Sequence, residues 1–273
     1  MKIVKMALII VFALSFGIFG VSEVMALGSR DVSDPVITSD RDVLEIPCEY
    51  TQEQLMEGLT ASDAEDGDLT DQIVAGSFSR FISDGVCSLT YVVFDSANRT
   101  ASLTRDVQFT DYHSPRFTMT EPLVFREQEG SYTEAMNRLS AQDVLDGDLD
   151  DWITQTDTDV NYSRAGSYTM SVEVSNSFGD TSTADLPVHV VTSDSQQVQI
   201  GLTTGIVYLQ QGTAINPSDY IESVIDSSGN SIDVSGVSVD SNVDSDTPGC
   251  YEIHYVTDGG ETWLTVIVEG GGE

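Results

Sequence analysis

The feature that most constrains the fold of this 273-residue chain is an internal repeat. The segment at residues 59–73, LTASDAEDGDLTDQI, recurs at residues 139–153 as LSAQDVLDGDLDDWI. A second motif follows each copy, at residues 85–93 and 166–174, and a third version of it stands at residues 248–256. Two full copies and a shortened third indicate duplication of one structural unit.

Apolar and polar residues alternate within these copies. In the first copy Leu89, Tyr91 and Val93 alternate with Ser88 and Thr90. A period of two is typical of strands that place one face in a core and the other in water. Turn signals stand at residues 95–98, 176–179 and 258–261, and strands return over residues 101–109, 182–191 and 262–268. Short strands with regular turns predict an all-β fold of tandem β-sandwich domains.

The order of these motifs resembles a known family. It runs from Asp-Pro-Val-Ile at residues 34–37, through an Ala-x-Asp-x-x-Asp-Gly-Asp-Leu loop, to a strand of the form Gly-x-Tyr-x-Val-x-Tyr and an Asp-Ser-Ala-Asn hairpin at residues 95–98. This order is similar to the bacterial immunoglobulin-like repeats found beside pesticidal crystal toxins, which are related to hyalin-type repeats. The resemblance covers residues 34–191 well and residues 197–268 loosely. It implies immunoglobulin-like sandwiches that act as spacers or adhesive units outside the cell, and it implies no reaction.

The repeats divide the chain into segments. We expect a signal peptide or an uncleaved anchor at residues 1–26, a linker at 27–33, immunoglobulin-like repeats at 34–112, 113–193 and 194–270, and a tail at 271–273. The third repeat is divergent, because DSSGN at residues 226–230 replaces the Asp-Gly-Asp loop. The joints at residues 111–115 and 192–195 are short, so we expect the domains to lie end to end as a stiff rod.

The first 26 residues have the pattern of a targeting segment. Lys2 and Lys5 precede an uncharged apolar run over residues 6–21, and small residues allow cleavage after Ala26. The run is shorter than the 20 or so residues, about 30 Å of helix, that span a bilayer. A cleaved signal is therefore preferred over an uncleaved anchor, and both predict a secreted or cell-surface location.

The chain is strongly acidic. It carries 45 Asp and Glu against 11 Lys and Arg, for a net charge of −34, and no Lys or Arg follows Arg164. Such a surface repels phosphate, which argues against nucleic acid and anionic membranes as partners. It attracts divalent cations and basic proteins, and it also favours solubility. Expected partners are a protein or glycan at a cell surface or copies of the chain itself, with membrane contact only through the N-terminal segment.

The acidic loops are the candidate metal site. The first copy supplies Asp63, Glu65, Asp66, Asp68 and Asp71, and the second supplies Asp143, Asp146, Asp148, Asp150 and Asp151. Calcium is bound by about six to eight oxygens on a flexible backbone, which such loops could supply. The other interpretation is turn chemistry, in which the glycine of each loop allows a left-handed turn, the next aspartate N-caps a short turn and a second aspartate completes a capping box. The two interpretations are compatible.

Three cysteines in an exported chain leave at least one unpaired. Cys48 and Cys87 fall in one repeat, and Cys87 takes an inward strand position, which predicts a disulfide between them. Such a bond would contribute about 3–4 kcal/mol; the alternative is two buried thiols. Cys250 precedes the inward Tyr251, so it should face outward as a free thiol or as a link between chains.

No constellation of residues predicts catalysis. The three histidines, His113, His189 and His254, belong to different repeats or joints, and the serines lack a nucleophile-elbow spacing. Trp263 lies on a predicted strand and is expected in a core. Trp152 follows the acidic loop and is expected to pack in a core or joint, with a binding face as the alternative.

These observations predict a non-catalytic extracellular or cell-surface protein that serves as a spacer, adhesin or structural component, with calcium as a candidate stabiliser. One alternative is a self-assembling filament or surface-layer subunit. A remote alternative is the accessory module of a secreted hydrolase.

Overall fold

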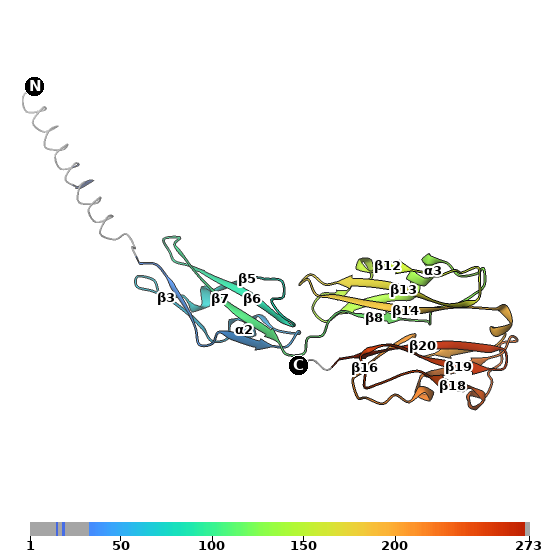
Figure 1. Cartoon of the computed structure of the whole chain (residues 1–273). Coiled ribbons are helices and arrows are strands. Elements are labelled where there is room, and N and C mark those ends of the chain that lie inside the picture. The colour runs from blue at the N-terminus through green and yellow to red at the C-terminus, as the bar shows by residue number, and fades with distance from the viewer. Residues whose placement is uncertain (1–14, 16–17, 20–32, 271–273) are drawn as a thin grey trace, which may run out of the picture. The chain divides into compact units, whose positions relative to one another are not determined.

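Figure 1 shows a computed structural model of the chain, which describes residues 15, 18–19 and 33–270. The predicted leader at residues 1–26, apart from those three positions, and the tail at 271–273 lie outside the described residues. No helix in the described part of the chain combines the length and the apolar character that a membrane span requires. The regular secondary structure of the described residues is mostly β-strand, with only short helices, which confirms the predicted fold class. The chain forms two compact units.

The first unit contains residues up to Ile46, Tyr50–Ser79 and Cys87–Gln108, and it forms one sandwich. One sheet has the order β1 (Val36–Ser39), β3 (Leu59–Asp63), β4 (Gly67–Asp68), and the other has the order β2 (Val43–Ile46), β7 (Thr100–Phe109), β6 (Val86–Phe94), β5 (Val74–Phe78). The helices are α2 (Gln52–Met56) and the 3-10 turn η1 (Thr70–Gln72). Leu89, Tyr91 and Val93 are fully buried between the sheets, as their alternation predicts.

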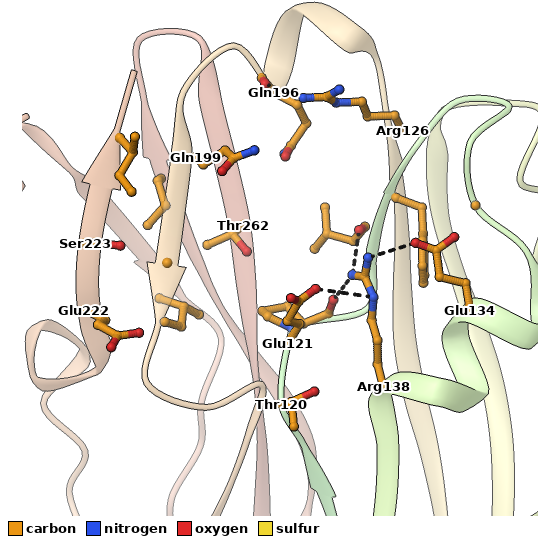
Figure 2. A pocket seen from close by; sticks show the side chains of 18 of the residues that line it. Thr120, Glu121, Arg126, Glu134, Arg138, Gln196, Gln199, Glu222, Ser223 and Thr262 are labelled. Atoms are coloured by element: carbon orange, nitrogen blue, oxygen red, sulfur yellow. Dashed lines mark hydrogen bonds and ion pairs between the residues drawn. The ribbon is translucent and has the colours of Figure 1, made fainter. Parts of the chain in front are cut away.

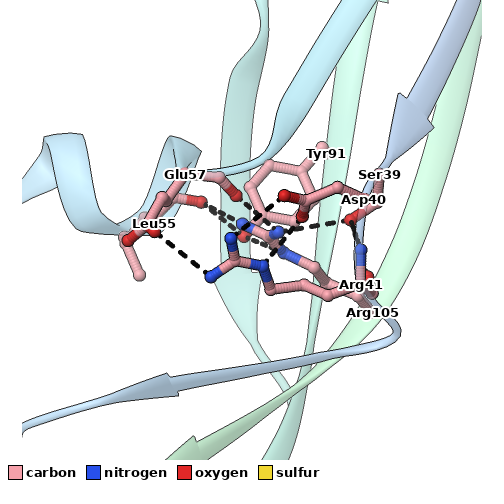
Figure 3. A network of polar contacts seen from close by, with 7 residues as sticks. All are labelled: Ser39, Asp40, Arg41, Leu55, Glu57, Tyr91 and Arg105. Atoms are coloured by element: carbon pink, nitrogen blue, oxygen red, sulfur yellow. Dashed lines mark hydrogen bonds and ion pairs between the residues drawn. The ribbon is translucent and has the colours of Figure 1, made fainter.

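A buried arginine fixes the end of α2 against this core (Figure 3). Arg105 is 3% exposed, and its guanidinium donates to the backbone oxygens of Leu55 and Glu57, both at 2.7 Å. It also donates to the hydroxyl groups of Tyr91 and Ser39, at 3.1 and 3.3 Å. The buried charge is therefore solvated by carbonyl and hydroxyl oxygens, as a group removed from water requires.

The second unit contains Pro47–Glu49, Arg80–Val86 and the chain from Phe109 onward, and it holds two sandwiches. In the second repeat the sheets are β11 (Gly147–Asp148), β10 (Leu139–Asp143), β8 (Arg116–Met119) and β12 (Thr154–Thr158), β13 (Gly166–Ser175), β14 (Thr181–Val191), β9 (Val124–Arg126). Its helices are α3 (Tyr132–Arg138) and η2 (Asp150–Trp152). Strand β9 runs parallel to β14 at the sheet edge.

The third repeat has the same plan with a smaller first sheet. That sheet pairs β15 (Gln199–Leu202) with β17 (Ile221–Ile225), and the other has the order β16 (Ile206–Gln210), β20 (Gly260–Glu269), β19 (Gly249–Thr257), β18 (Ser238–Ser241). The short helices are η3 (Ser193–Ser195), η4 (Pro217–Tyr220) and η5 (Val234–Gly236). Strand β16 runs parallel to β20, as β9 does to β14.

The main hairpins of the first two repeats share one turn geometry, in which Asn98 and Gly179 take the same place with φ of 62° and 85°. The third repeat has a shorter turn between Thr257 and Gly260, in which Gly259 has φ of 79°. A left-handed residue at this place lets a short loop follow the twist of the strands, and glycine or asparagine adopts it at low cost. The side chains of Asp95 and Asn176 accept the backbone N–H four residues on, at 2.7 and 2.9 Å.

The expected end-to-end arrangement does not hold for the second and third repeats, which form one compact unit. Strand β8 contacts β16, and β14 contacts β19. Ile206 of β16 is buried in the hydrophobic core of the second repeat, and Tyr208 and Ile267 pack against that core. The joint after β14 is the 3-10 turn η3, and Gln196, just after it, bridges to Gly260 of the third repeat. A short joint thus allows side-by-side packing, because it keeps two apolar surfaces close together.

Candidate functional site

The acidic loop of the first repeat is ordered by its own backbone. Asp63 is 7% exposed, and its carboxylate accepts the N–H groups of Glu65 and Asp66 at 2.8 and 3.1 Å. Asp68 accepts the N–H of Thr70 at 2.9 Å, and hydrogen bonding with Thr70 holds the pKa of Asp68 below its ordinary value. These are the local bonds by which aspartate stabilises a turn.

The loop of the second repeat has the same contacts. Asp143 is 5% exposed and accepts the N–H groups of Leu145 and Asp146, both at 2.9 Å. Asp148 accepts the N–H of Asp150 at 2.9 Å. The two loops are therefore equivalent in structure as well as in sequence.

A further aspartate joins each loop to the neighbouring hairpin. Asp66 accepts the N–H of Ser96 at 2.7 Å, and Asp146 accepts the N–H of Ser177 at 2.5 Å. The predicted capping box is not formed, because the N-cap residues of η1 and η2 are leucines without a side-chain capping bond. Asp71 and Asp151 lie exposed inside these 3-10 turns. The carboxylates of the loops thus accept backbone hydrogen bonds that stabilise the turns and attach them to the hairpins.

The calcium role of these loops stays a prediction. Among the residues that the structure describes, no three His, Cys, Asp or Glu side chains gather in an arrangement that could hold a metal ion. Most of the loop aspartates already accept backbone N–H groups, which are the donors that a turn supplies.

The disulfide predicted between Cys48 and Cys87 is not formed, and all three cysteines are free thiols. Cys87 is fully buried, and burial raises the pKa of its thiol to about 11. Cys48 is half-buried, its backbone N–H donates to Asp111 at 2.7 Å, and burial together with the Asp111 carboxylate raises the pKa of its thiol to about 12. Cys250 is exposed on β19.

The two tryptophans differ from expectation. Trp152 is 67% exposed in η2, so the expected packing in the core of its repeat is wrong, and packing at a joint or a binding face stays a prediction for it. Trp263 is half-buried, and its ring stacks between two imidazoles instead of lying within a sandwich core.

This imidazole–indole–imidazole stack joins the second and third repeats. The ring centroids of His189 and Trp263 are 3.9 Å apart, and those of His254 and Trp263 are 4.1 Å apart, with interplanar angles of 9° and 5°. His189 of β14 also lies 2.5 Å from the carboxylate of Glu252, and His254 lies 3.1 Å from that of Glu261. Both histidines therefore serve packing between the repeats.

Gly205 brings the backbones of the two repeats together. Its N–H donates to the oxygen of Met119 in the second repeat at 2.9 Å, while its own oxygen accepts the N–H of Thr265 within the third repeat at 3.1 Å. A Cβ at position 205 would lie 2.8 Å from the backbone of Glu121 and from the side chain of Met119. Only glycine fits this approach without a shift of one repeat.

Polar contacts from the first two residues of β8 complete the interface. The guanidinium of Arg116 donates to the Glu269 carboxylate at 2.9 and 2.5 Å. The N–H of Phe117 donates to the Tyr208 hydroxyl at 2.8 Å, and burial raises the pKa of Tyr208 to about 12. Apolar packing, stacked rings and paired charges together join the two repeats into one compact unit.

A cleft of about 560 Å³ lies beside this interface (Figure 2). Its wall on the second repeat includes β9 and the helix end at Arg138, and its wall on the third repeat includes β15 and β17. This volume is in the range typical of small-ligand and peptide pockets. Sequence reasoning missed the cleft, because its walls come from segments far apart in the chain.

The arginines of the cleft are already engaged. Arg138 donates to the backbone oxygens of Pro122 and Val124 at 2.7 and 3.1 Å, and it pairs with the Glu134 carboxylate at 3.3 Å. Arg126 donates to the backbone oxygen of Gln196 at 2.9 Å. These guanidinium groups shape the wall and leave little capacity for an incoming anion.

A second pocket, of about 490 Å³, contains Cys48, Asp111 and His113. This grouping has the residue types of a thiol catalyst. The raised pKa keeps the Cys48 thiol protonated near neutral pH, and His113 directs its Nδ1 to the oxygen of Ser114 at 2.9 Å. The pocket therefore offers no activated nucleophile.

Comparisons with solved structures give distant likenesses. An S-layer protein, rSbsC, is 13% identical with a TM-score of 0.22, covering 88% of this chain and 41% of that one. A protocadherin gammaB7 fragment is 10% identical with a TM-score of 0.21, covering 87% of this chain and 77% of that one. A chain with a CBM51 domain bound to GlcNAc, from Clostridium perfringens ZmpB, is 17% identical with a TM-score of 0.24, covering 56% and 26%.

Sequence comparisons are more informative. Residues 208–268 match the bacterial Ig-like domain (group 3). The pesticidal crystal protein Cry22Aa of Bacillus thuringiensis is 28% identical over 206 residues, which are 73% of this chain and 27% of that protein. The third repeat of this chain therefore matches the bacterial Ig-like domain of group 3, and the chain has a distant similarity to a pesticidal crystal protein over most of its length.

Proposed function

We propose that this chain is an exported, non-catalytic protein of the bacterial cell surface, whose second and third repeats act together as one binding unit. The observation that carries the proposal is the fixed pairing of these repeats around Gly205 and Trp263. Rigid pairing holds the walls of the cleft in place, and a preorganised site loses less entropy when it binds.

Three further features support this role. The leader pattern at residues 1–26 favours export, and the net charge of −34 favours a soluble surface that attracts basic partners. The matched family is one of immunoglobulin-like domains, a fold that carries exposed loops and edges on a stable core. Spacing and adhesion are the two tasks that such a scaffold performs without catalysis.

Labelling of intact cells tests the proposal. The full chain would be produced in a bacterium with an epitope tag after Gly270, beside a control that begins at Leu27. We expect antibody to detect the full chain on intact cells or in the medium, and protease added outside to remove the cell-bound signal. The control should stay inside the cell. Retention of the full chain in the cytoplasm would overturn the proposal.

A further inference from the structure

The outer edge of β15 is a free strand edge. Strand β15 pairs with β17 alone among the described strands. Val224 stands opposite Ile200 in this ladder, and its oxygen accepts the N–H of Ile232 at 2.8 Å, on the far side of β17. Both backbone groups of one residue in an antiparallel ladder point to the same side, so Ile200 points away from β17. Its N–H and C=O therefore face outward at a position that lines the cleft.

The cleft opens where β15 separates from the neighbouring hairpin. The N–H of Val198 still donates to the oxygen of Gly259 at 2.8 Å. Two positions later that pairing has ended, and Thr262 of β20 lines the space between the strands (Figure 2). An extended segment in the cleft would continue, at Ile200, the pairing that Val198 begins.

The opposite edge is closed to such pairing. Arg138 occupies the oxygens of Pro122 and Val124 at the edge of β9. A charged side chain that covers the edge of a sheet is a common means of blocking further strands. The structure therefore offers the β15 edge, and not the β9 edge, to a peptide backbone.

The charge of the cleft favours a basic occupant. The lining includes four glutamates, Glu121, Glu129, Glu134 and Glu222, against two arginines, Arg126 and Arg138. Both arginines already pair with glutamates, whereas Glu222 on β17 is exposed and makes no hydrogen bond or ion pair within the described structure. A second copy of this chain, at a net charge of −34, would be repelled.

The lining also argues against a sugar as the occupant. Phe125 is its one aromatic residue, and this ring is 4% exposed and lies beneath the Arg138 guanidinium at 4.4 Å. No ring in the lining is therefore open for stacking, while the backbone groups of Ile200 match an extended chain.

We propose that the cleft binds an extended, positively charged segment of a partner protein, which adds as a strand to the free edge of β15. The inference rests on the proposed binding role of the paired repeats and names the class of ligand. Backbone hydrogen bonds to Ile200 align the segment, and Glu222 attracts its lysine or arginine side chains.

Fluorescence anisotropy with synthetic peptides tests the inference on the chain from Leu27. The probe is a short labelled peptide of alternating lysine and valine. A glutamate–valine peptide of equal length tests charge, and the lysine–valine peptide with methylated backbone nitrogens tests strand pairing. We expect the first peptide to bind, the second not to bind, and the third to bind at least about tenfold more weakly.

Variants of the chain locate the site. Ile200→Pro removes the outward N–H at a position where an edge strand tolerates proline, and Ile200→Val keeps it. Glu222→Gln removes the free carboxylate, and Asp240→Asn removes an exposed carboxylate on β18, outside the cleft. We expect about a tenfold loss for Ile200→Pro, a severalfold loss for Glu222→Gln and no loss for the two controls. If Ile200→Pro fails to fold, as non-cooperative unfolding would show, the binding measured for Glu222→Gln and for the methylated peptide decides whether the inference holds.

Absence of binding by the lysine–valine peptide would overturn the inference. So would equal binding of the methylated peptide or equal loss in Asp240→Asn, since both would reveal attraction to the acidic surface in general. The cell-labelling experiment stands apart from these results. A surface-exposed chain with an inactive cleft contradicts this inference alone, and a peptide-binding chain retained in the cytoplasm contradicts the proposed location alone.

Discussion

At the scale of single residues, Gly205 matters because it has no side chain. Its missing Cβ lets the third repeat come within hydrogen-bonding distance of Met119. We predict that Gly205→Ala destabilises the chain by about 1–3 kcal/mol, the cost of forcing atoms into a packed interface. Urea unfolding measures the change. Gly236→Ala is the matched control, because a Cβ at 236 meets nothing within 4 Å. Equal stability of the two variants would contradict the close approach at position 205.

Arg105 is a second residue whose role is set by its surroundings. We predict that Arg105→Met lowers the free energy of unfolding by about 3 kcal/mol, because it leaves buried oxygens at the end of α2 without donors. Arg41→Met is the control, since Arg41 pairs with Asp40 at the surface nearby (Figure 3) and its loss should change stability little. Thermal unfolding compares the two. If Arg105→Met were more stable than the unmodified chain, an apolar side chain at position 105 would stabilise the core more than the buried guanidinium does, and the prediction would be wrong.

At the scale of elements, the acidic loops and the hairpins act as one turn assembly. We predict that Asp66→Ala and Asp146→Ala each lower the melting temperature to the same extent in EDTA and in calcium, because each removes bonds to a hairpin serine. Asp151→Ala, at an exposed position in η2, is the control. A melting temperature that rises with calcium in the unmodified chain, and no longer rises in the variants, would instead establish the loops as metal sites.

The strands and hairpins could be predicted because their signals are local. The alternation at Leu89, Tyr91 and Val93 and the turn residues around Asn98 and Gly179 act within a few positions. The predicted disulfide between Cys48 and Cys87 is not formed. The alternation predicts that Cys87 points inward, but no local pattern shows that the Cys48 N–H donates to Asp111.

The packing of two repeats could not be predicted for a different reason. His189 and Glu252 are 63 positions apart, and each is a residue type found on ordinary sheet faces. The cleft is likewise assembled from short segments of both repeats, and no motif marks them. Pairing between distant sheet faces depends on shape, which a linear pattern does not record.

At the scale of the whole molecule, low pH should destabilise the fold by protonating carboxylates that accept hydrogen bonds in turns. Hydrogen bonds from Thr70 to Asp68, from Cys48 to Asp111 and from Asn230 to Asp226 lower these pKa values below 3.8. A depressed pKa contributes stability above the unfolded value and loses it as the pH falls through the folded value. We predict a melting temperature that falls below about pH 4, although the net charge shrinks there. A continued rise at lower pH would mean that charge repulsion outweighs the turns.

The central claim is that the second and third repeats form one unit. Hydrogen exchange followed by NMR tests it most directly, on the chain from Leu27 and its Gly205→Ala variant. Two amides donate across the interface: the Phe117 N–H to the Tyr208 hydroxyl, and the N–H of residue 205 to the Met119 oxygen. We predict that the variant loses protection at both amides together, one in each repeat. Loss at residue 205 with full protection at Phe117 would show that the repeats are independent, and would contradict the claim.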